Sequence, residues 1–142
     1  MQAVYDLMML AHEECGEHKV SPEKVLQKIA LATHRQASLI GVVGPVGERF
    51  LKGYVLLIIE PVWYSDDYQL LEVSNFVHPD HRRSDYAKQL IVFSKRCAEN
   101  LALDLTMGVY SNERTEAKVR LYRRQLPPVG AFFCYKPNKE AV

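Results

Sequence analysis

The sequence contains few cysteines, and their spacing is irregular. Only three, Cys15, Cys97 and Cys134, occur among 142 residues. An odd and widely separated set of this kind excludes a disulfide framework and a zinc ribbon. We therefore expect free thiols in a reducing compartment. The densest group of possible metal ligands has a spacing that matches no common metal site, so no metal is expected; it consists of His12, Glu13, Cys15 and His18.

Long apolar runs and a dominant charge are also absent. The longest apolar run, from Tyr54 to Ile59, is much shorter than the ~18–20 residues that cross a bilayer, and the first residues do not resemble a signal peptide. The chain carries 18 Lys and Arg against 17 Asp and Glu, a net charge of +1. Proteins held to nucleic acid by charge are far more basic. We expect a cytoplasmic protein with no membrane partner, and nucleic acid is disfavoured as a partner.

The length and composition are those of one folded domain. Hydrophobic residues make up 48% and charged residues 25% of the chain. These proportions are ordinary for a globular protein and exclude disorder over most of the length. Because domains of roughly 100–150 residues are the commonest size, residues 1–142 are expected to form a single domain.

Hydrophobic periodicity divides the chain into helices and strands. Helical patterns cover residues 2–15, a stretch that begins at Ser21 and Pro22, residues 85–100 and residues 115–125. Strand patterns cover residues 37–43, 50–60, 70–77, 103–110 and 129–135, and short connections favour an antiparallel meander of the first three. The order α-α-β-β-β-α-β-α-β predicts a mixed α/β (α+β) domain, with a central sheet flanked by helices.

The third strand carries polar residues among apolar ones. Strict alternation would place Leu70, Glu72, Ser74 and Phe76 on one face and Leu71, Val73, Asn75 and Val77 on the other. Since Ser74 and Asn75 are unusual in such a strand, we expect them to line a pocket. An ionisable Glu72 at the same place predicts a cleft, although a solvated strand end would also explain it.

The segment between this strand and the next helix carries the clearest chemical signal. It reads Val77-His78-Pro79-Asp80-His81-Arg82-Arg83-Ser84-Asp85-Tyr86-Ala87. A strand that feeds a helix through a short loop aims backbone N–H groups at one point, where the helix dipole adds positive charge. This arrangement predicts a phosphate-binding turn. A capped helix with solvated arginines is the alternative.

This segment, followed by Leu90-Ile91, resembles the coenzyme A-binding motif of the GNAT superfamily of acetyl-CoA-dependent N-acetyltransferases. A second segment, from Ala117 to Gln125 with Leu121-Tyr122, is similar to another conserved region of that family. The stretch 107–135 is also similar to short, phage-encoded members. The resemblance spans residues 21–135 and implies a GNAT fold with acetyl-CoA as the acyl donor.

The resemblance implies a role for each matching residue. The coenzyme A pyrophosphate would lie on the loop and first helical turn, formed by Arg82, Arg83, Ser84, Asp85, Tyr86, Ala87 and Lys88. The pantetheine arm would pair with the strand end at Phe76 and Val77, and Asn112 would lie near the adenosine or pantetheine. Tyr122 would protonate the leaving thiolate, and Glu72 would act as general base towards a primary amine.

The resemblance also implies expectations about the partners. The loop with Trp63, Tyr64, Asp66 and Asp67 would border the acceptor, which we expect to be a small-molecule or peptide amine. Because the chain opens on a helix where family members open on a strand, a second copy would complete the sheet edge, so we expect a homodimer. The basic helix surface of Lys118, Arg120, Arg123 and Arg124 would be solvated or meet a phosphate.

The sequence also departs from the family pattern within the two matching motifs. Asp85 stands where the loop has its first glycine, and Leu126-Pro127 replaces a Gly-Phe pair. An added carboxylate beside a pyrophosphate weakens its binding. Two alternatives therefore stay open, a degenerate GNAT-fold protein that acts as an interaction module and a nucleic-acid-binding domain.

Overall fold

The computed structural model describes residues 1–44, 50–110 and 114–138. Its helices and strands follow in the order α1 (Gln2–Cys15), α2 (Pro22–Thr33), β1 (Ser38–Val43), β2 (Gly53–Pro61), β3 (Tyr68–Val77), η1 (Pro79–His81, a 3-10 turn), α3 (Tyr86–Leu101), β4 (Leu105–Thr106) and α4 (Thr115–Gln125). The four predicted helices are confirmed, and α4 has the predicted bounds.

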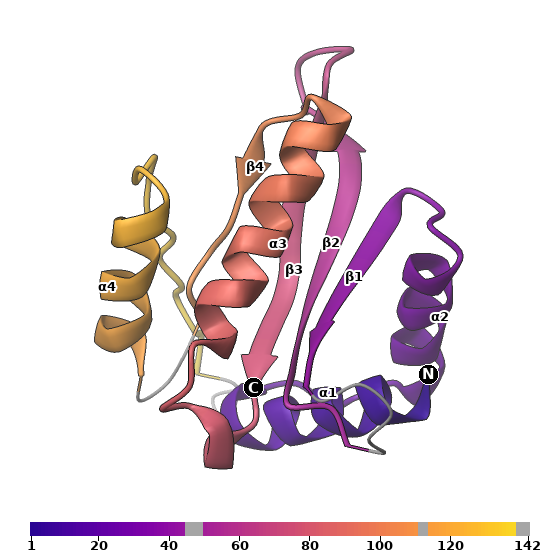
Figure 1. Ribbon diagram of the computed structural model, residues 1–142, viewed down its shortest axis with the longest axis vertical. Helices are drawn as coiled ribbons and strands as arrows, with labels where there is room; N and C mark the ends of the chain where they lie inside the picture. The colour runs from indigo at the N-terminus through magenta and orange to yellow at the C-terminus, as the bar shows by residue number, and fades with distance from the viewer. Residues whose placement is uncertain (45–49, 111–113, 139–142) are drawn as a thin grey trace.

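The strands form one mixed sheet in the order β1-β2-β3-β4 (Figure 1). The pairs β1–β2 and β2–β3 are antiparallel, which confirms the predicted meander. β4 joins the sheet in parallel with β3 through two residue pairs, Leu70 with Leu105 and Leu71 with Thr106. Beyond these pairs β3 and β4 diverge, and α4 lies on the outer side of β4 (Figure 1).

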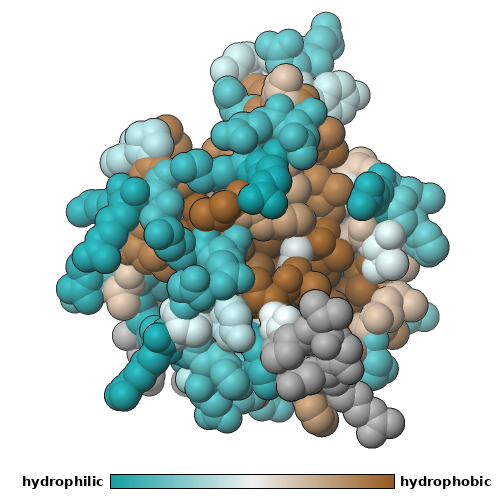
Figure 2. All heavy atoms as spheres, in the orientation of Figure 1, coloured by the Kyte–Doolittle hydropathy of each residue, from teal (hydrophilic) through white to brown (hydrophobic). Residues whose placement is uncertain are grey.

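Helices cover the two faces of the sheet. On one face α3 packs Leu90 against Val55, Leu57 and Leu70. On the other face α1 packs Leu7 against the buried Tyr54 and Phe76. Figure 2 shows apolar side chains gathered in the hollow between α3 and α2, while hydrophilic residues cover the outer sides of the helices. The sheet is therefore held between α1 and α3, which positions the ends of β3.

A β-bulge in β3 overturns the predicted alternation. Leu56 pairs with Ser74 and Leu57 with Glu72, so Val73 is an extra residue without a partner in β2. Leu70 consequently packs on the α3 face while Phe76 packs on the α1 face, although strict alternation placed them together. Glu72 and Asn75, opposite Leu57 and Val55, now share a face.

Two predicted strands differ from the structure. The strand expected over residues 103–110 is limited to Leu105–Thr106, and residues 129–135 form no strand. In the latter segment Phe132 and Phe133 are 96% and 95% exposed. Their composition favours a strand, but this segment pairs with none of the described strands.

None of the described helices is both long enough and apolar enough to cross a membrane. Within the same residues, no three His, Cys, Asp or Glu side chains are grouped so that they could hold a metal ion.

Candidate functional site

A cleft of about 570 Å³ opens where β3 and β4 diverge. Residues 72–76 of β3 form one wall, and the chain after β4, from Gly108 to Tyr110, forms another. Residues of α1 and α2 close a third side, among them Met8, Met9 and Val25. The cleft therefore lies where two neighbouring strands of the described sheet separate.

Three polar side chains meet at this point. The amide of Asn75 donates a hydrogen bond to Oε2 of Glu72 at 2.9 Å, and the hydroxyl of Tyr122 donates to the same oxygen at 3.1 Å. Asn75 also donates to the hydroxyl of Tyr122. Glu72 and Asn75 line the cleft, while Tyr122 contacts both from α4. The bulge at Val73 makes this cluster possible, because it turns Glu72 and Asn75 to the same face.

Burial controls the protonation of the cluster. Loss of solvent around Glu72 raises the pKa of its carboxyl to about 7, and the hydrogen bonds from Tyr122 and Asn75 oppose part of this rise. Burial, aided by the nearby Glu72 carboxylate, also raises the pKa of Tyr122, so the phenol keeps its proton at neutral pH. The site thus holds a carboxyl that is half ionised near neutrality beside a protonated phenol.

The strand face towards α1 extends the cleft wall. Ser74 lines the cleft, as expected, and its hydroxyl shares a 2.8 Å hydrogen bond with the hydroxyl of Tyr54. Burial raises the pKa of Tyr54 to about 12. Both hydroxyls are therefore satisfied, and they form a fixed polar edge in a largely apolar wall.

The loop before α3 has the geometry of an anion site. The Ser84 hydroxyl accepts a 3.2 Å hydrogen bond from the amide of Tyr86, and the amide of Gln89 bonds to the carbonyl of Asp85. The amides of Ala87 and Lys88 lie between them in the first turn, where a helix provides no internal acceptor. Arg83 and Lys88 are exposed beside this turn. Backbone and charge together suit a phosphate.

Arg82 lies apart from this anion site. Its guanidinium forms an ion pair with Glu14 of α1, donates from Nε to the carbonyl of Val77 at 3.2 Å, and stacks 5.3 Å from the ring centroid of Phe76. These contacts tie the loop to α1 and the end of β3. The Arg82 side chain could bind a phosphate only if its contacts with Glu14, Val77 and Phe76 were broken. In this structure Arg82 therefore holds the loop in place.

Asp85 is exposed at the start of α3, and its carboxylate accepts a 2.7 Å hydrogen bond from the side chain of Gln89. The negative charge therefore stands in the same turn as the amides of Ala87 and Lys88. It opposes an incoming phosphate, as the departure from the family pattern predicts.

The other predicted residues lie in several places. Phe76 is buried against α1 and also lines the cleft, and Val77 packs with the core below α3; pairing of their backbone with a pantetheine arm stays a prediction. Asn112 lies outside the described residues. The loop with Trp63 and Tyr64 does not line the cleft, and these two side chains are 92% and 74% exposed.

Sequence reasoning missed several residues of the cleft. His12 and Cys15 line it from α1, Lys28 from α2 and Lys118 from α4. The helical period put Lys118 on a basic surface, yet it also lies one turn before Tyr122. That i, i+4 relation was the one signal that could have placed Lys118 at the site.

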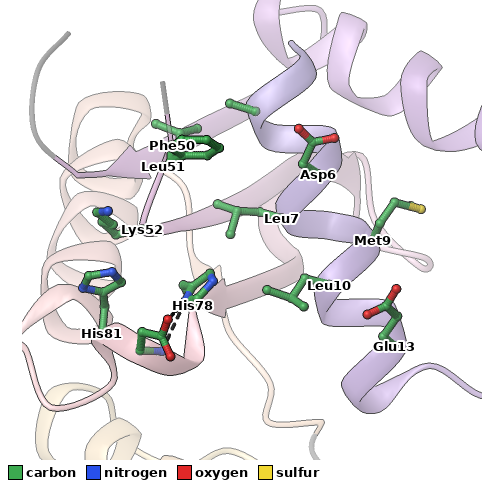
Figure 3. A pocket seen from close by; sticks show the side chains of 12 residues that line it. Asp6, Leu7, Met9, Leu10, Glu13, Phe50, Leu51, Lys52, His78 and His81 are labelled. Carbon is green, nitrogen blue, oxygen red and sulfur yellow. Dashed lines mark hydrogen bonds and ion pairs between the residues drawn. The ribbon is translucent and has the colours of Figure 1, made fainter. Parts of the chain in front are cut away.

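A second cavity of about 490 Å³ lies between α1 and the segment that follows β3 (Figure 3). Asp6 and Glu13 line it from α1, opposite Lys52, His78 and His81. None of the residues 82–88 lines this cavity, and neither do Glu72 and Tyr122. It therefore does not include the anion site, and it adjoins the cleft at Met9, which lines both.

Comparison with known proteins relates the chain to acetyltransferases by structure alone. No protein-family model matches the sequence, and no curated protein matches it. The structure of AAC(6')-Iy in complex with a bisubstrate analogue, CoA-S-monomethyl-acetylneamine, superimposes with a TM-score of 0.70 at 14% identity, over 96% of this chain and 90% of that one.

Two further solved structures agree with this likeness. The apo aminoglycoside 6'-N-acetyltransferase of Acinetobacter haemolyticus has a TM-score of 0.65 at 15% identity, over 97% of this chain and 93% of that one. A Trypanosoma brucei acetyltransferase has a TM-score of 0.66 at 14% identity, over 95% and 92%. The chain has the fold of the GNAT N-acetyltransferases.

Proposed function

We propose that this protein is an N-acetyltransferase that transfers an acetyl group from acetyl-CoA to a primary amine. The observation that carries the proposal is the hydrogen-bonded cluster of Glu72, Asn75 and Tyr122 at the divergence of β3 and β4. It combines a possible base and a possible acid within one cleft. The structural neighbours include an acetyltransferase bound to a CoA-containing analogue, which supports the choice of donor.

The residues before and within α3 fit the phosphates of coenzyme A. The first-turn amides of Ala87 and Lys88 would hold the pyrophosphate, with Arg83 and the Lys88 ammonium beside them. Arg82 would keep the loop in register through its contacts with Glu14 and Val77. Acetyl-CoA, when bound, supplies an acetyl thioester whose carbonyl carbon an amine can attack.

Glu72 performs the first proton transfer. At neutral pH an amine is mostly protonated, and it becomes a nucleophile only when a base removes one proton. A carboxyl with a pKa of about 7 is half ionised there, and it is a stronger base than an ordinary glutamate. Its position in the cleft wall gives it direct access to an acceptor in the cleft.

Tyr122 performs the second proton transfer. When the carbon–sulfur bond breaks, the sulfur leaves with the electron pair, and Tyr122 donates its phenolic proton to it. The 3.1 Å hydrogen bond then lets Glu72 pass to Tyr122 the proton it took from the ammonium, and the acylated nitrogen releases its second proton to solvent, so both residues are restored and one proton is released per turnover. Asn75 holds the two groups together, and the backbone N–H at the bulged Val73 would polarise the thioester oxygen.

The proposal is tested by calorimetric titration with acetyl-CoA, followed by release of free thiol in the presence of an amine panel. We expect binding in the native protein and weaker binding after Arg83→Ala with Lys88→Ala. Tyr122→Phe should keep acetyl-CoA binding while lowering kcat by about 100-fold or more, the scale of general-acid catalysis. Absence of acetyl-CoA binding at millimolar concentration would refute the proposal.

One observation favours a second function, that of a GNAT-fold interaction module. The Asp85 carboxylate stands at the anion site, and this charge counts against the donor. A protein that fails to bind acetyl-CoA but gains binding after Asp85→Gly would fit this alternative.

A further inference from the structure

The cleft is basic. Among the described residues that line it, Glu72 is the single acidic side chain, whereas Lys28, Lys118 and His12 are basic. Glu72 is itself half neutral at pH 7. An acceptor that enters this cleft therefore meets more positive than negative charge.

Lys118 is the basic residue whose charge acts on Glu72. It lies four residues before Tyr122 in α4, so the two side chains leave the same face of the helix. Its side chain is half-buried, and within the described chain it forms no ion pair. Burial lowers the pKa of Lys118, and the attraction of Glu72 and Cys15 compensates only in part. Among the described residues, no carboxylate lies within ion-pair distance of this ammonium.

The acidic residues around the cleft are engaged elsewhere. Glu14 pairs with Arg82, and Glu17 pairs with Lys136. The acidic loop of Asp66 and Asp67, which was expected to border the acceptor, does not line the cleft. The positive charge of the cleft is therefore left for a ligand to neutralise.

We propose that the acceptor is a small primary amine that also carries an anionic group, a carboxylate or a phosphate, and that Lys118 binds this group while the amine faces Glu72. The proposal rests on the acetyltransferase function above and narrows its acceptor. The remaining lining is mostly apolar, with Met8, Met9 and Val25, so a hydrophobic substituent fits between the two charged ends.

This chemistry excludes a polycation. A molecule with several ammonium groups would bring like charges against Lys118 and Lys28, and Glu72 is the one carboxylate among the described lining residues to oppose them. The acceptor class thus differs from the aminoglycosides after which several structural neighbours are named.

The test compares primary amines that carry an anionic group with similar amines that lack one. L-phenylalanine is set against L-phenylalaninamide, and β-alanine and 2-aminoethyl phosphate are set against propylamine, which separates carboxylate from phosphate. Neamine serves as the polycation. Binding is measured calorimetrically with and without coenzyme A, and acetyl transfer is measured by thiol release. We expect the anionic partner of a pair to be preferred by about 10- to 100-fold, the range of a charge-assisted hydrogen bond.

Variants assign the preference to Lys118. Lys118→Met keeps the apolar stem and should reduce the preference to near unity. Lys118→Glu should reverse it and improve binding of neamine. Arg120→Met is the matched control, because it removes a positive charge from the exposed side of the same helix and should leave the preference unchanged.

The outcomes separate the two proposals. Equal or better binding of the neutral partners overturns the anionic acceptor, whether or not acetyl transfer occurs. A preference that survives in Lys118→Met also overturns it. Acetyl transfer only to amines without an anionic group would leave the acetyltransferase function standing. Failure to bind acetyl-CoA would refute that function. In that case the preference measured without coenzyme A would still show whether the cleft binds an anionic ligand.

Discussion

Replacement of Glu72 by glutamine should make the protein more stable at alkaline pH while it removes the proposed base. Glutamine has the same shape, and its oxygen can still accept the hydrogen bonds of Asn75 and Tyr122. The one property it loses is the ability to ionise. The variant therefore isolates the free energy of holding a carboxylate in this cleft.

The magnitude follows from the pKa of Glu72, which burial raises from 4.5 to about 7. Each pKa unit corresponds to 1.36 kcal/mol, so the ionised residue destabilises the fold by about 3 kcal/mol. Between pH 4.5 and 7 the native state binds more protons than the unfolded state, so stability falls as pH rises. Below this window the native protein and Glu72→Gln should be equally stable, and above it the variant should gain.

Urea unfolding at intervals from pH 4 to pH 9 measures the difference. The two stability curves should coincide at the acid end, separate through neutrality and run parallel above pH 8. Asp66→Asn, in an exposed loop, serves as the control and should show no such separation. Parallel curves for Glu72→Gln and the native protein across the whole range would refute a buried carboxyl with a raised pKa.

Four more predictions follow from the same structure. The pH dependence of kcat/KM should rise with a midpoint near 7 as Glu72 ionises, and Glu72→Gln should abolish this limb. Asp85→Gly should tighten acetyl-CoA binding by about 5-fold in calorimetry, since one like charge at 4 Å costs about 1 kcal/mol in water. Gly41→Ala should lower the thermal midpoint, because its Cβ would lie 2.5 Å from the Phe93 ring, and Phe93→Leu should restore part of the loss. Light scattering should give twice the mass of one chain, since a second copy would cover the exposed aromatic side chains of Phe132, Phe133 and Tyr135; a monomer at every concentration would contradict this.

Local patterns predicted the elements whose stability is local. The period of residues 85–100 and the bounds of α4 are properties of the helices themselves, and both agree with the structure. The bulge at Val73 depends instead on how β3 pairs with β2, and strict alternation could not reveal it. The segment 129–135 failed for the same reason, because a strand exists only where a neighbour accepts its hydrogen bonds.

The site was partly foreseeable through resemblance. Glu72 and Tyr122 were named from family motifs 50 positions apart, and the structure places them within hydrogen-bond distance, although their catalytic roles stay predictions. The contact of Arg82 with Glu14 joins residues 68 positions apart and depends on where α1 packs. Lys118 was read as a surface residue because its helix, taken alone, does not reveal the cleft beside it.

The bulge also determines which changes in the gene this strand could tolerate. Side chains at position 73 are half exposed and make no hydrogen bond that the site needs, since Val73 is 49% exposed. Many amino-acid substitutions at position 73 would therefore have little effect on the protein. A deletion of the same codon would let β3 pair with β2 without interruption, and it would turn either Glu72 or Asn75 to the opposite face. The number of residues in β3, more than the identity of residue 73, is what keeps Glu72, Asn75 and Tyr122 together.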